Sequence, residues 1–415
     1  TYPEGQVDPA LPTSTGQPGA RYPSAIFSNN SDVRATAIWN EYTSPVYGGG
    51  DYGGVPMYIF DQNPIANTTF NLSSMMHLNN GCLDLNTAQG EVCNPPDLWN
   101  GNVQLVNGSN VNPTLLSVFT SWGGTEYSYP DYMIKSTSFN NGYISLADPY
   151  FFHNEATDLN ADDNCLWYEC TGYTGDPDFY VNDNGIGYMG MSSHTYNSDT
   201  EAPFLHTFFF RKTSDYGATW SSDGGYQNSG YHYISDSVLI RLSDSLYTLW
   251  TNNPDLYPER LWYNEVINYD DTSDDYYLTP GLFLGYDYDI KTDHAGGLHI
   301  VTTALPYLCI DIDGGCSDAD DNGLADNIVM EARFGNSGMY HFYNPDPINT
   351  PNNWTASLVK DMSDTYIADF PTNGNLLLDG LAWFYFYPKI QQILVYLHHT
   401  YFYILFLFFL FCLAK

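Results

Sequence analysis

The chain has 415 residues, with 48 aspartate and glutamate against 12 lysine and arginine residues, for a formal net charge of −36. A surface this acidic repels phosphate backbones, so the charge balance excludes nucleic acid as a partner. Abundant glycine, proline, asparagine and tyrosine favour turns and strands over helices. No long stretch with a 3.6-residue apolar period is evident before the C-terminal tail. We therefore predict an all-β protein.

The N-terminal part is expected to begin with an extended segment, residues 1–20, which is rich in Pro, Gly, Ser and Thr. Residues 21–27 and 35–42 follow as two strands joined by a polar turn. The glycine-rich residues 48–54 predict a loop, because so many glycines weaken a strand.

Two hairpins are predicted from their turn residues. Asn140-Asn141-Gly142 separates short runs at 132–135 and 143–146, and an Asn-Gly pair is the preferred two-residue hairpin turn. Asp293 to Gly297 likewise joins strands at 286–290 and 298–301. Other expected strands are 185–191, 204–211, 238–242, 327–333, 338–343 and 354–359.

The stretch Thr213-Ser214-Asp215-Tyr216-Gly217-Ala218-Thr219-Trp220 follows an apolar strand and carries the most specific motif. A Thr hydroxyl and an Asp carboxylate two residues apart can accept backbone N–H bonds across a tight turn. Gly217 supplies a positive φ, and Trp220 supplies an apolar plug. The pattern resembles the Asp-box of sialidase-like β-propellers, in which the box is a structural turn remote from the catalytic centre. The resemblance implies a propeller over residues 21–382, and strand-rich units of about 50–60 residues suggest about six four-stranded blades.

Six of the seven cysteines form three close pairs in Gly, Asn and Asp-rich loops. Such local pairs favour loop-stapling disulfides in an oxidising compartment. Zinc is the competing interpretation, but no Cys-x-x-Cys doublet is present and no histidine has ligand spacing beside the pairs. The predicted pairs are Cys82 with Cys93, Cys165 with Cys170, and Cys309 with Cys316.

An acidic loop at residues 318–326 predicts a structural calcium site. Oxygen ligands at alternate positions, a glycine at the bend and a later carboxylate are what Ca²⁺ requires of a loop. The pattern resembles the calcium loops of thrombospondin type 3 and dockerin-like repeats, and an acidic surface turn without metal is the alternative. The expected ligands are the side chains of Asp318, Asp320, Asn322 and Asp326 and the carbonyl of Leu324.

Arg21 is the first candidate catalytic residue. Ala20-Arg21-Tyr22-Pro23 resembles the x-Arg-x-Pro motif with which sialidases open, and that likeness implies that Arg21 begins a carboxylate-binding arginine triad. Glu331, with Tyr340 or Tyr343, would supply the acid and nucleophile of such an enzyme. The alternative is that Arg21 simply begins a strand.

Residues 390–415 form an almost continuous apolar tail. The tail is long enough to span a membrane, so a membrane anchor is one expectation. A buried terminal element and sequence that is not native to the protein are the others, because Gly, Asp and Asn vanish abruptly there.

Together these features predict a secreted or cell-surface, calcium-stabilised propeller that acts as a binding or adhesion module towards glycans or other surface ligands. The N-terminal sequence also resembles surface proteins exported by the type IX route. A retaining exo-glycosidase of sialidase type is the first alternative, and a structural surface-layer component is the second.

Overall fold

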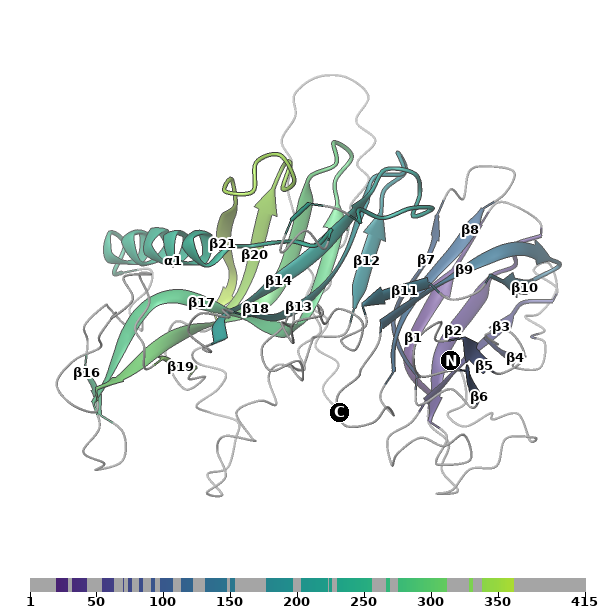
Figure 1. The fold of residues 1–415 in the computed structure, drawn as a ribbon, viewed down its shortest axis with the longest axis horizontal. Coiled ribbons are helices and arrows are strands. Elements are labelled where there is room, and N and C mark those ends of the chain that lie inside the picture. Colours follow the sequence, from purple (N-terminus) through teal and green to yellow (C-terminus); the bar gives the residue numbers. More distant parts are fainter. Residues whose placement is uncertain are drawn as a thin grey trace. The chain divides into compact units, whose positions relative to one another are not determined.

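The computed structural model contains 21 β-strands and one α-helix in the part of the chain that it describes (Figure 1). The described residues are 20–28, 32–42, 54–62, 70, 74–76, 82–84, 91–93, 98–106, 113–121, 131–147, 150–153, 177–196, 203–222, 224–225, 230–255, 266–268, 275–311, 328–330 and 338–361. The chain forms two compact units, Thr1–Phe204 with Phe210–His232 and Leu205–Phe209 with Tyr233–Lys415.

The first two sheets lie in the first unit. Sheet I has the order β1 (Ala20–Ile26), β2 (Thr36–Tyr42), β3 (Gly54–Phe60) and β4 (Ser74–Met75). Sheet II has the order β10 (Tyr143–Leu146), β9 (Asp131–Asn140), β8 (Thr114–Ser121) and β7 (Leu98–Val106), and β11 (Tyr150–His153) also pairs with β9. A separate ribbon pairs β5 (Cys82–Asp84) with β6 (Glu91–Cys93).

Two further sheets follow along the chain. Sheet III has the order β12 (Asp178–Val181), β13 (Gly187–Tyr196), β14 (Pro203–Thr213) and β15 (His232–Tyr233). Sheet IV has the order β16 (Val266–Asn268), β17 (Asp275–Thr292), β18 (Leu298–Asp311), β20 (Gly338–Asn344) and β21 (Thr355–Asp361), with β19 (Ile328–Met330) paired to β18. The fold is therefore mostly β, as predicted.

Both predicted hairpins are confirmed. β9 and β10 meet at Asn141 and Gly142, which have φ values of 51° and 95°, as a two-residue turn of the Asn-Gly kind requires. β17 and β18 meet at the turn that begins with Asp293. The strands predicted around 21–27, 35–42, 185–191, 204–211, 338–343 and 354–359 are confirmed as well.

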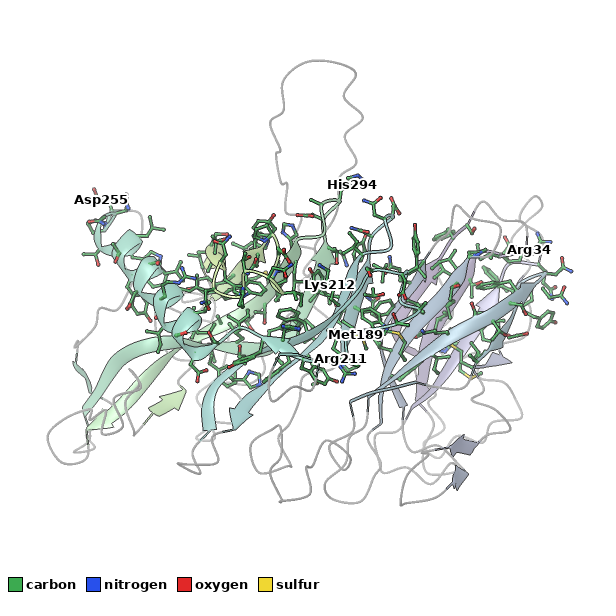
Figure 2. All side chains as sticks on the ribbon, turned by 45° about the horizontal axis from the view of Figure 1, so that its top comes forward. Arg34, Met189, Arg211, Lys212, Asp255 and His294 are labelled. Carbon is green, nitrogen blue, oxygen red and sulfur yellow. The ribbon has the colours of Figure 1, made fainter. Side chains whose placement is uncertain are left out.

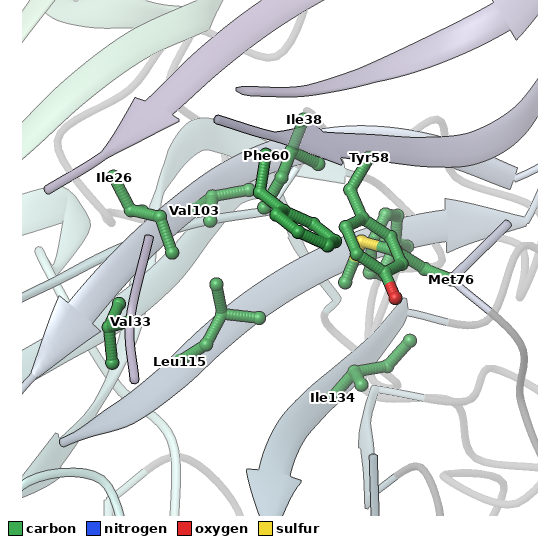
Figure 3. Close-up of a cluster of buried hydrophobic side chains, with 10 residues drawn as sticks. Ile26, Val33, Ile38, Tyr58, Phe60, Met76, Val103, Leu115 and Ile134 are labelled. Carbon is green, nitrogen blue, oxygen red and sulfur yellow. The ribbon is translucent and has the colours of Figure 1, made fainter. Parts of the chain in front are cut away.

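The core of the first unit lies between sheets I and II. Ile26, Ile38 and Phe60 from sheet I pack with Leu115 and Ile134 from sheet II, and each is at most 3% exposed (Figure 3). The residues of β3 from Met57 to Phe60 are all buried, and so are those of β8 from Leu115 to Phe119, so both faces of these strands are covered.

The strand predicted at 238–242 is wrong, because these residues belong to helix α1 (Asp236–Thr251). The apolar residues do not stop at Leu242 but continue at Leu246, Tyr247 and Trp250, which is the spacing of one helix face. The expectation that no such period precedes the tail is therefore also wrong. Ser243 on the buried face accepts the N–H of Gly281 at 2.9 Å, which ties α1 to β17.

About six blades are not confirmed, because the described residues contain four sheets of four or more strands. Residues 1–19, the calcium loop and the tail at 390–415 lie outside the described residues. Within the described part of the chain, no helix is both long enough and apolar enough to cross a membrane.

Candidate functional site

The turn after β14 contains the residues of the predicted Asp-box. The hydroxyl of Thr213 accepts the N–H of Gly217 at 3.0 Å and donates to Oδ1 of Asp215 at 2.8 Å. Asp215 accepts the N–H of Thr219 at 2.9 Å and its hydroxyl at 2.6 Å. Trp220 is 7% exposed and closes the turn on the core side. The side chains of Thr213 and Asp215 thus each accept a backbone N–H of the turn, which suits a structural role.

Neighbouring strands constrain the same turn. Gly217 has φ 75°, and a Cβ there would lie 2.6 Å from Cδ1 of Leu116. The ammonium of Lys135 on β9 donates to the carbonyl of Ala218 at 2.7 Å, and Figure 2 shows Arg211 and Lys212 along the strand that leads into the turn. Burial opposes ionisation of Asp215, but the bonds from Thr219 and the charge of Lys135 still lower its pKa.

A turn of related construction follows β20 in sheet IV. The side chain of Asn344 accepts the N–H of Asp346 at 2.9 Å and the Thr350 hydroxyl at 3.3 Å, and Trp354, 1% exposed, packs beyond it. The sequence did not reveal this second turn, because Trp354 lies eight residues after Asp346, whereas Trp220 lies five after Asp215.

A cluster of titratable side chains lies at the β17–β18 hairpin. Oδ1 of Asp293 accepts the N–H of Gly297 at 2.8 Å. Its Oδ2 lies 3.4 Å from Nε2 of His299 and accepts the Tyr343 hydroxyl at 3.3 Å. A Cβ on residue 297 would lie 2.6 Å from Oδ2 of Asp293 and 2.9 Å from the Tyr343 ring, so a larger residue there would displace these two side chains. His294 marks the tip of this hairpin in Figure 2.

Strand register adds His341 to the cluster. His299 pairs with Tyr343 and Val301 pairs with His341, so His341 and Tyr343, two residues apart on β20, share one face. Nδ1 of His299 lies 2.9 Å from Nε2 of His341, and the two rings stack with centroids 5.1 Å apart. The ring of Tyr343 stacks on His299 at 4.4 Å. We call Asp293, His299, His341 and Tyr343 the hairpin cluster.

The opposite face of sheet IV is apolar. Ile290, Ile300 and Phe342 pair across β17, β18 and β20 and are fully buried. On the cluster's face, Lys291 pairs with Asp289 at 3.3 Å. The hairpin cluster and the Lys291–Asp289 ion pair therefore share the polar face of sheet IV, and the other face of this sheet forms part of the core.

Partial burial controls the electrostatics of the hairpin cluster. Desolvation, reinforced by the neighbouring His299, lowers the pKa of His341 to about 4. Desolvation also lowers the pKa of His299, although Asp293 opposes the shift. Burial, followed by the charge of Asp293, raises the pKa of Tyr343. At neutral pH the cluster therefore contains uncharged imidazoles and a protonated phenol beside a carboxylate.

This arrangement suits hydrogen bonding rather than metal coordination. His299 presents opposite ring nitrogens to His341 and Asp293, so the three groups do not converge on one point. No metal-holding group of three His, Cys, Asp or Glu side chains occurs among the described residues. The side chain of Asp293 is 28% exposed, so the carboxylate can meet a ligand.

The other predicted site residues are placed as follows. Arg21 lies on β1 opposite Asn40, and its side chain is outside the described residues, as are Glu331 and Arg333. Arg211 lies over the Tyr231 ring at 4.1 Å, and Arg241 donates to two loop carbonyls. The catalytic role of Arg21 stays a prediction.

The ribbon of β5 and β6 places Cys82 directly opposite Cys93. Cys309 lies on β18, and its proposed partner Cys316 lies outside the described residues, as do Cys165 and Cys170. The calcium ligands Asp318, Asp320, Asn322, Leu324 and Asp326 also lie outside them.

Sequence reasoning missed the hairpin cluster. It placed His299 only within the strand predicted at 298–301 and named Tyr343 only as a candidate nucleophile, and His341 lies 42 residues from His299. The signal that joins them is the pairing of β18 with β20, which a single sequence does not display.

Comparison with known proteins yields likenesses to solved structures. No family model matches the chain, and no curated protein matches it. Similar solved structures include an α-L-arabinanase of Penicillium chrysogenum complexed with arabinobiose (12% identity, 81% of this chain and 80% of that chain, TM-score 0.32). Another is an endo-arabinase of Bacteroides thetaiotaomicron (12% identity, 74% of this chain and 72% of that chain, TM-score 0.30). A third is the GH93 α-L-arabinofuranosidase of Fusarium graminearum (9% identity, 81% of this chain and 80% of that chain, TM-score 0.30). Likenesses this remote assign neither family nor activity to the chain.

Proposed function

We propose that the chain is an extracellular or cell-surface glycan-binding protein and that the hairpin cluster is its ligand site. The observation that carries the proposal is the composition of the cluster. A partly exposed carboxylate lies beside a phenol and two neutral imidazoles, and the rings of the phenol and the imidazoles stack on one another. Carboxylate, imidazole and phenol groups exchange hydrogen bonds readily with sugar hydroxyls, and aromatic faces attract the weakly positive C–H groups of a sugar ring.

The hydrogen-bond distances at Asp293 allow such an exchange. Oδ1 of Asp293 is fixed by the short bond from Gly297, whereas Oδ2 has two longer contacts of 3.3 and 3.4 Å to Tyr343 and His299. A ligand hydroxyl that bonds Oδ2 more closely would compete with these two longer contacts.

The architectural part of the proposal is a sialidase-like β-propeller with an Asp-box at Thr213 to Trp220, exported by the type IX route. Its support is the sheet topology, because sheets of about four antiparallel strands that follow one another in sequence are the units of propellers.

Calcium bound by Asp318, Asp320, Asn322, Leu324 and Asp326 would stabilise this fold. If so, EDTA lowers the Tm of the wild type and leaves that of Asp320→Ala unchanged; an unaltered wild-type Tm contradicts the calcium proposal.

A glycan array followed by calorimetry tests the ligand site. Tyr343→Phe removes the hydroxyl that contacts Asp293 but keeps the stacked ring, so we expect the Kd for the bound glycan to rise about five- to tenfold. Tyr216→Phe is the matched control, because it removes a hydroxyl that donates to Asp183 in the other unit. Equal affinity for wild type and Tyr343→Phe contradicts the site, and hydrolysis of array sugars favours the glycosidase alternative.

A further inference from the structure

The hairpin cluster contains two oxygens that can only accept hydrogen bonds from a ligand. The side chain of Asp293 is 28% exposed, and its Oδ2 accepts the hydroxyl of Tyr343 at 3.3 Å. An ionised carboxylate has no proton to donate, and the phenol donates its single proton to Asp293. The phenol oxygen therefore offers a ligand only its lone pairs. Oδ2 of Asp293 and the oxygen of Tyr343 thus form a pair of acceptors 3.3 Å apart.

Gly297 lets these two oxygens come together. Its N–H donates to Oδ1 of Asp293 at 2.8 Å, which anchors the carboxylate. A Cβ on residue 297 would lie 2.6 Å from Oδ2 of Asp293 and 3.1 Å from the oxygen of Tyr343, so a larger residue would push the pair apart. The stacking of Tyr343 on His299, with centroids 4.4 Å apart, restrains the phenol as well. The two acceptors are therefore positioned before a ligand arrives.

The imidazoles of the cluster do not compensate the charge of the carboxylate. Nε2 of His299 faces Asp293 at 3.4 Å, and Nδ1 of His299 faces Nε2 of His341 at 2.9 Å. Desolvation lowers the pKa of both imidazoles, so both are neutral at pH 7. The cluster as a whole is therefore negative at this pH.

The cation that strand pairing brings to this face is directed to another carboxylate. Lys291 lies opposite His299 across β17 and β18. Its ammonium lies 3.3 Å from Oδ1 of Asp289, whose side chain is 1% exposed. The chain also has a formal net charge of −36, which attracts cations to its surface. The electrostatics therefore favour a ligand group with a positive charge.

We propose that the hairpin cluster selects a glycan that contains an amino sugar, and that the sugar ammonium donates to Oδ2 of Asp293 and to the oxygen of Tyr343. This selection rests on the proposed function, because it concerns the same site. An ammonium has three donors and no acceptor, so one group can satisfy both oxygens, whereas a sugar hydroxyl has a single proton and satisfies one. Hydrogen bonds between charged groups are also about twice as strong as those between neutral groups.

Calorimetry with two matched oligosaccharides tests the selection. The first is a hexamer of glucosamine, and the second is the same hexamer with every amine N-acetylated, which removes the charge and leaves one N–H donor on each nitrogen. The titrations are made at about pH 6 and about 0.15 M salt, where a primary amine is protonated and long-range attraction is screened. We expect the glucosamine hexamer to bind about tenfold or more tightly than its acetylated form.

Asp293→Asn is the decisive variant. Asparagine keeps an oxygen that accepts the N–H of Gly297 and suits the turn, but it replaces Oδ2 with an amide group that donates. We expect the Kd for the glucosamine hexamer to rise about 10- to 100-fold. Asp255→Asn is the matched control, because it makes the same change in net charge at an exposed position of the same unit and should leave the Kd unchanged (Figure 2).

Three results would overturn the proposal: the two hexamers bind with equal Kd, Asp255→Asn weakens binding as much as Asp293→Asn does, or hexalysine binds as tightly as the glucosamine hexamer. If equal binding of the two hexamers is still weakened by Tyr343→Phe, the amine selection fails and the cluster remains a site for sugar hydroxyls. Binding that Tyr343→Phe leaves unchanged would contradict the proposed function itself.

Discussion

Nδ1 of His299 lies 2.9 Å from Nε2 of His341, and the opposite ring nitrogen of His299 faces the carboxylate of Asp293 at 3.4 Å. An ionised carboxylate only accepts, so Nε2 of His299 carries the proton that points to Asp293. Nδ1 of neutral His299 must then accept, and Nε2 of His341 must donate. The chain of hydrogen bonds has one direction, and it leaves Nδ1 of His341 as the nitrogen that takes up the next proton.

The low pKa of His341 makes the stability of the protein depend on pH. The pKa of His341 is lowered to about 4 from 6.5, so between these values the unfolded chain binds more protons than the folded one. Stability conferred by neutral His341 is therefore complete above pH 6.5 and is lost as pH falls, by up to about 3 kcal/mol. Imidazole NMR titration checks the midpoint, and chemical denaturation of wild type and His341→Gln checks the slope. A His341 that titrates near 6.5 contradicts the geometry.

Asp236 is expected to make stability depend on pH in the opposite direction to His341. Its Oδ1 is excluded from solvent with no hydrogen-bond partner in the described structure, although the residue as a whole is partly exposed, and desolvation raises its pKa to about 7. The folded state binds the extra proton between pH 3.8 and about 7, so the contribution to stability is present below 3.8 and is lost as pH rises. We expect Asp236→Asn to stabilise the protein by about 1–3 kcal/mol at pH 8 and by almost nothing at pH 3.5. Denaturation curves at both pH values measure this, and an equal effect at the two would contradict it.

The turn after β14 predicts a difference between two glycine substitutions. Gly217 and Gly224 have φ values of 75° and 72°, so alanine is strained at both. Only at Gly217 does the new Cβ meet another residue, Leu116, which is fully buried and cannot retreat freely. We expect Gly224→Ala to cost about 1 kcal/mol and Gly217→Ala about 2–4 kcal/mol in unfolding free energy. Equal costs from thermal denaturation would show that the turn is not packed against β8.

The ribbon of β5 and β6 predicts a disulfide. Cys82 and Cys93 are direct cross-strand partners, and their backbones are within the distance that a disulfide spans. Non-reducing peptide mapping should show the two cysteines linked. Cys82→Ser should cost about 3 kcal/mol, the loop-closure value for a loop of this length. Two free thiols in the folded protein, purified without a reducing agent, would refute the pairing.

The structural features that a few neighbouring residues encode could be predicted from the sequence. The Asn-Gly turn at Asn141 and the glycine turn after Asp293 are encoded within a few residues, and both hairpins were found. Helix α1 was missed because the short run at 238–242 was read apart from Leu246 and Trp250, which complete its buried face. The hairpin cluster was missed for another reason: His299 and His341 meet only through the register of β18 and β20.

The most direct test of the account follows the imidazoles of His299 and His341 by NMR while the glycan selected on the array is added. Single His→Gln variants assign their signals. If the hairpin cluster binds the glycan, both signals shift saturably, with the Kd that calorimetry gives. The shifts then shrink in Tyr343→Phe but persist in Tyr216→Phe. A glycan that binds while both signals stay in place would contradict the assignment of the hairpin cluster as the ligand site.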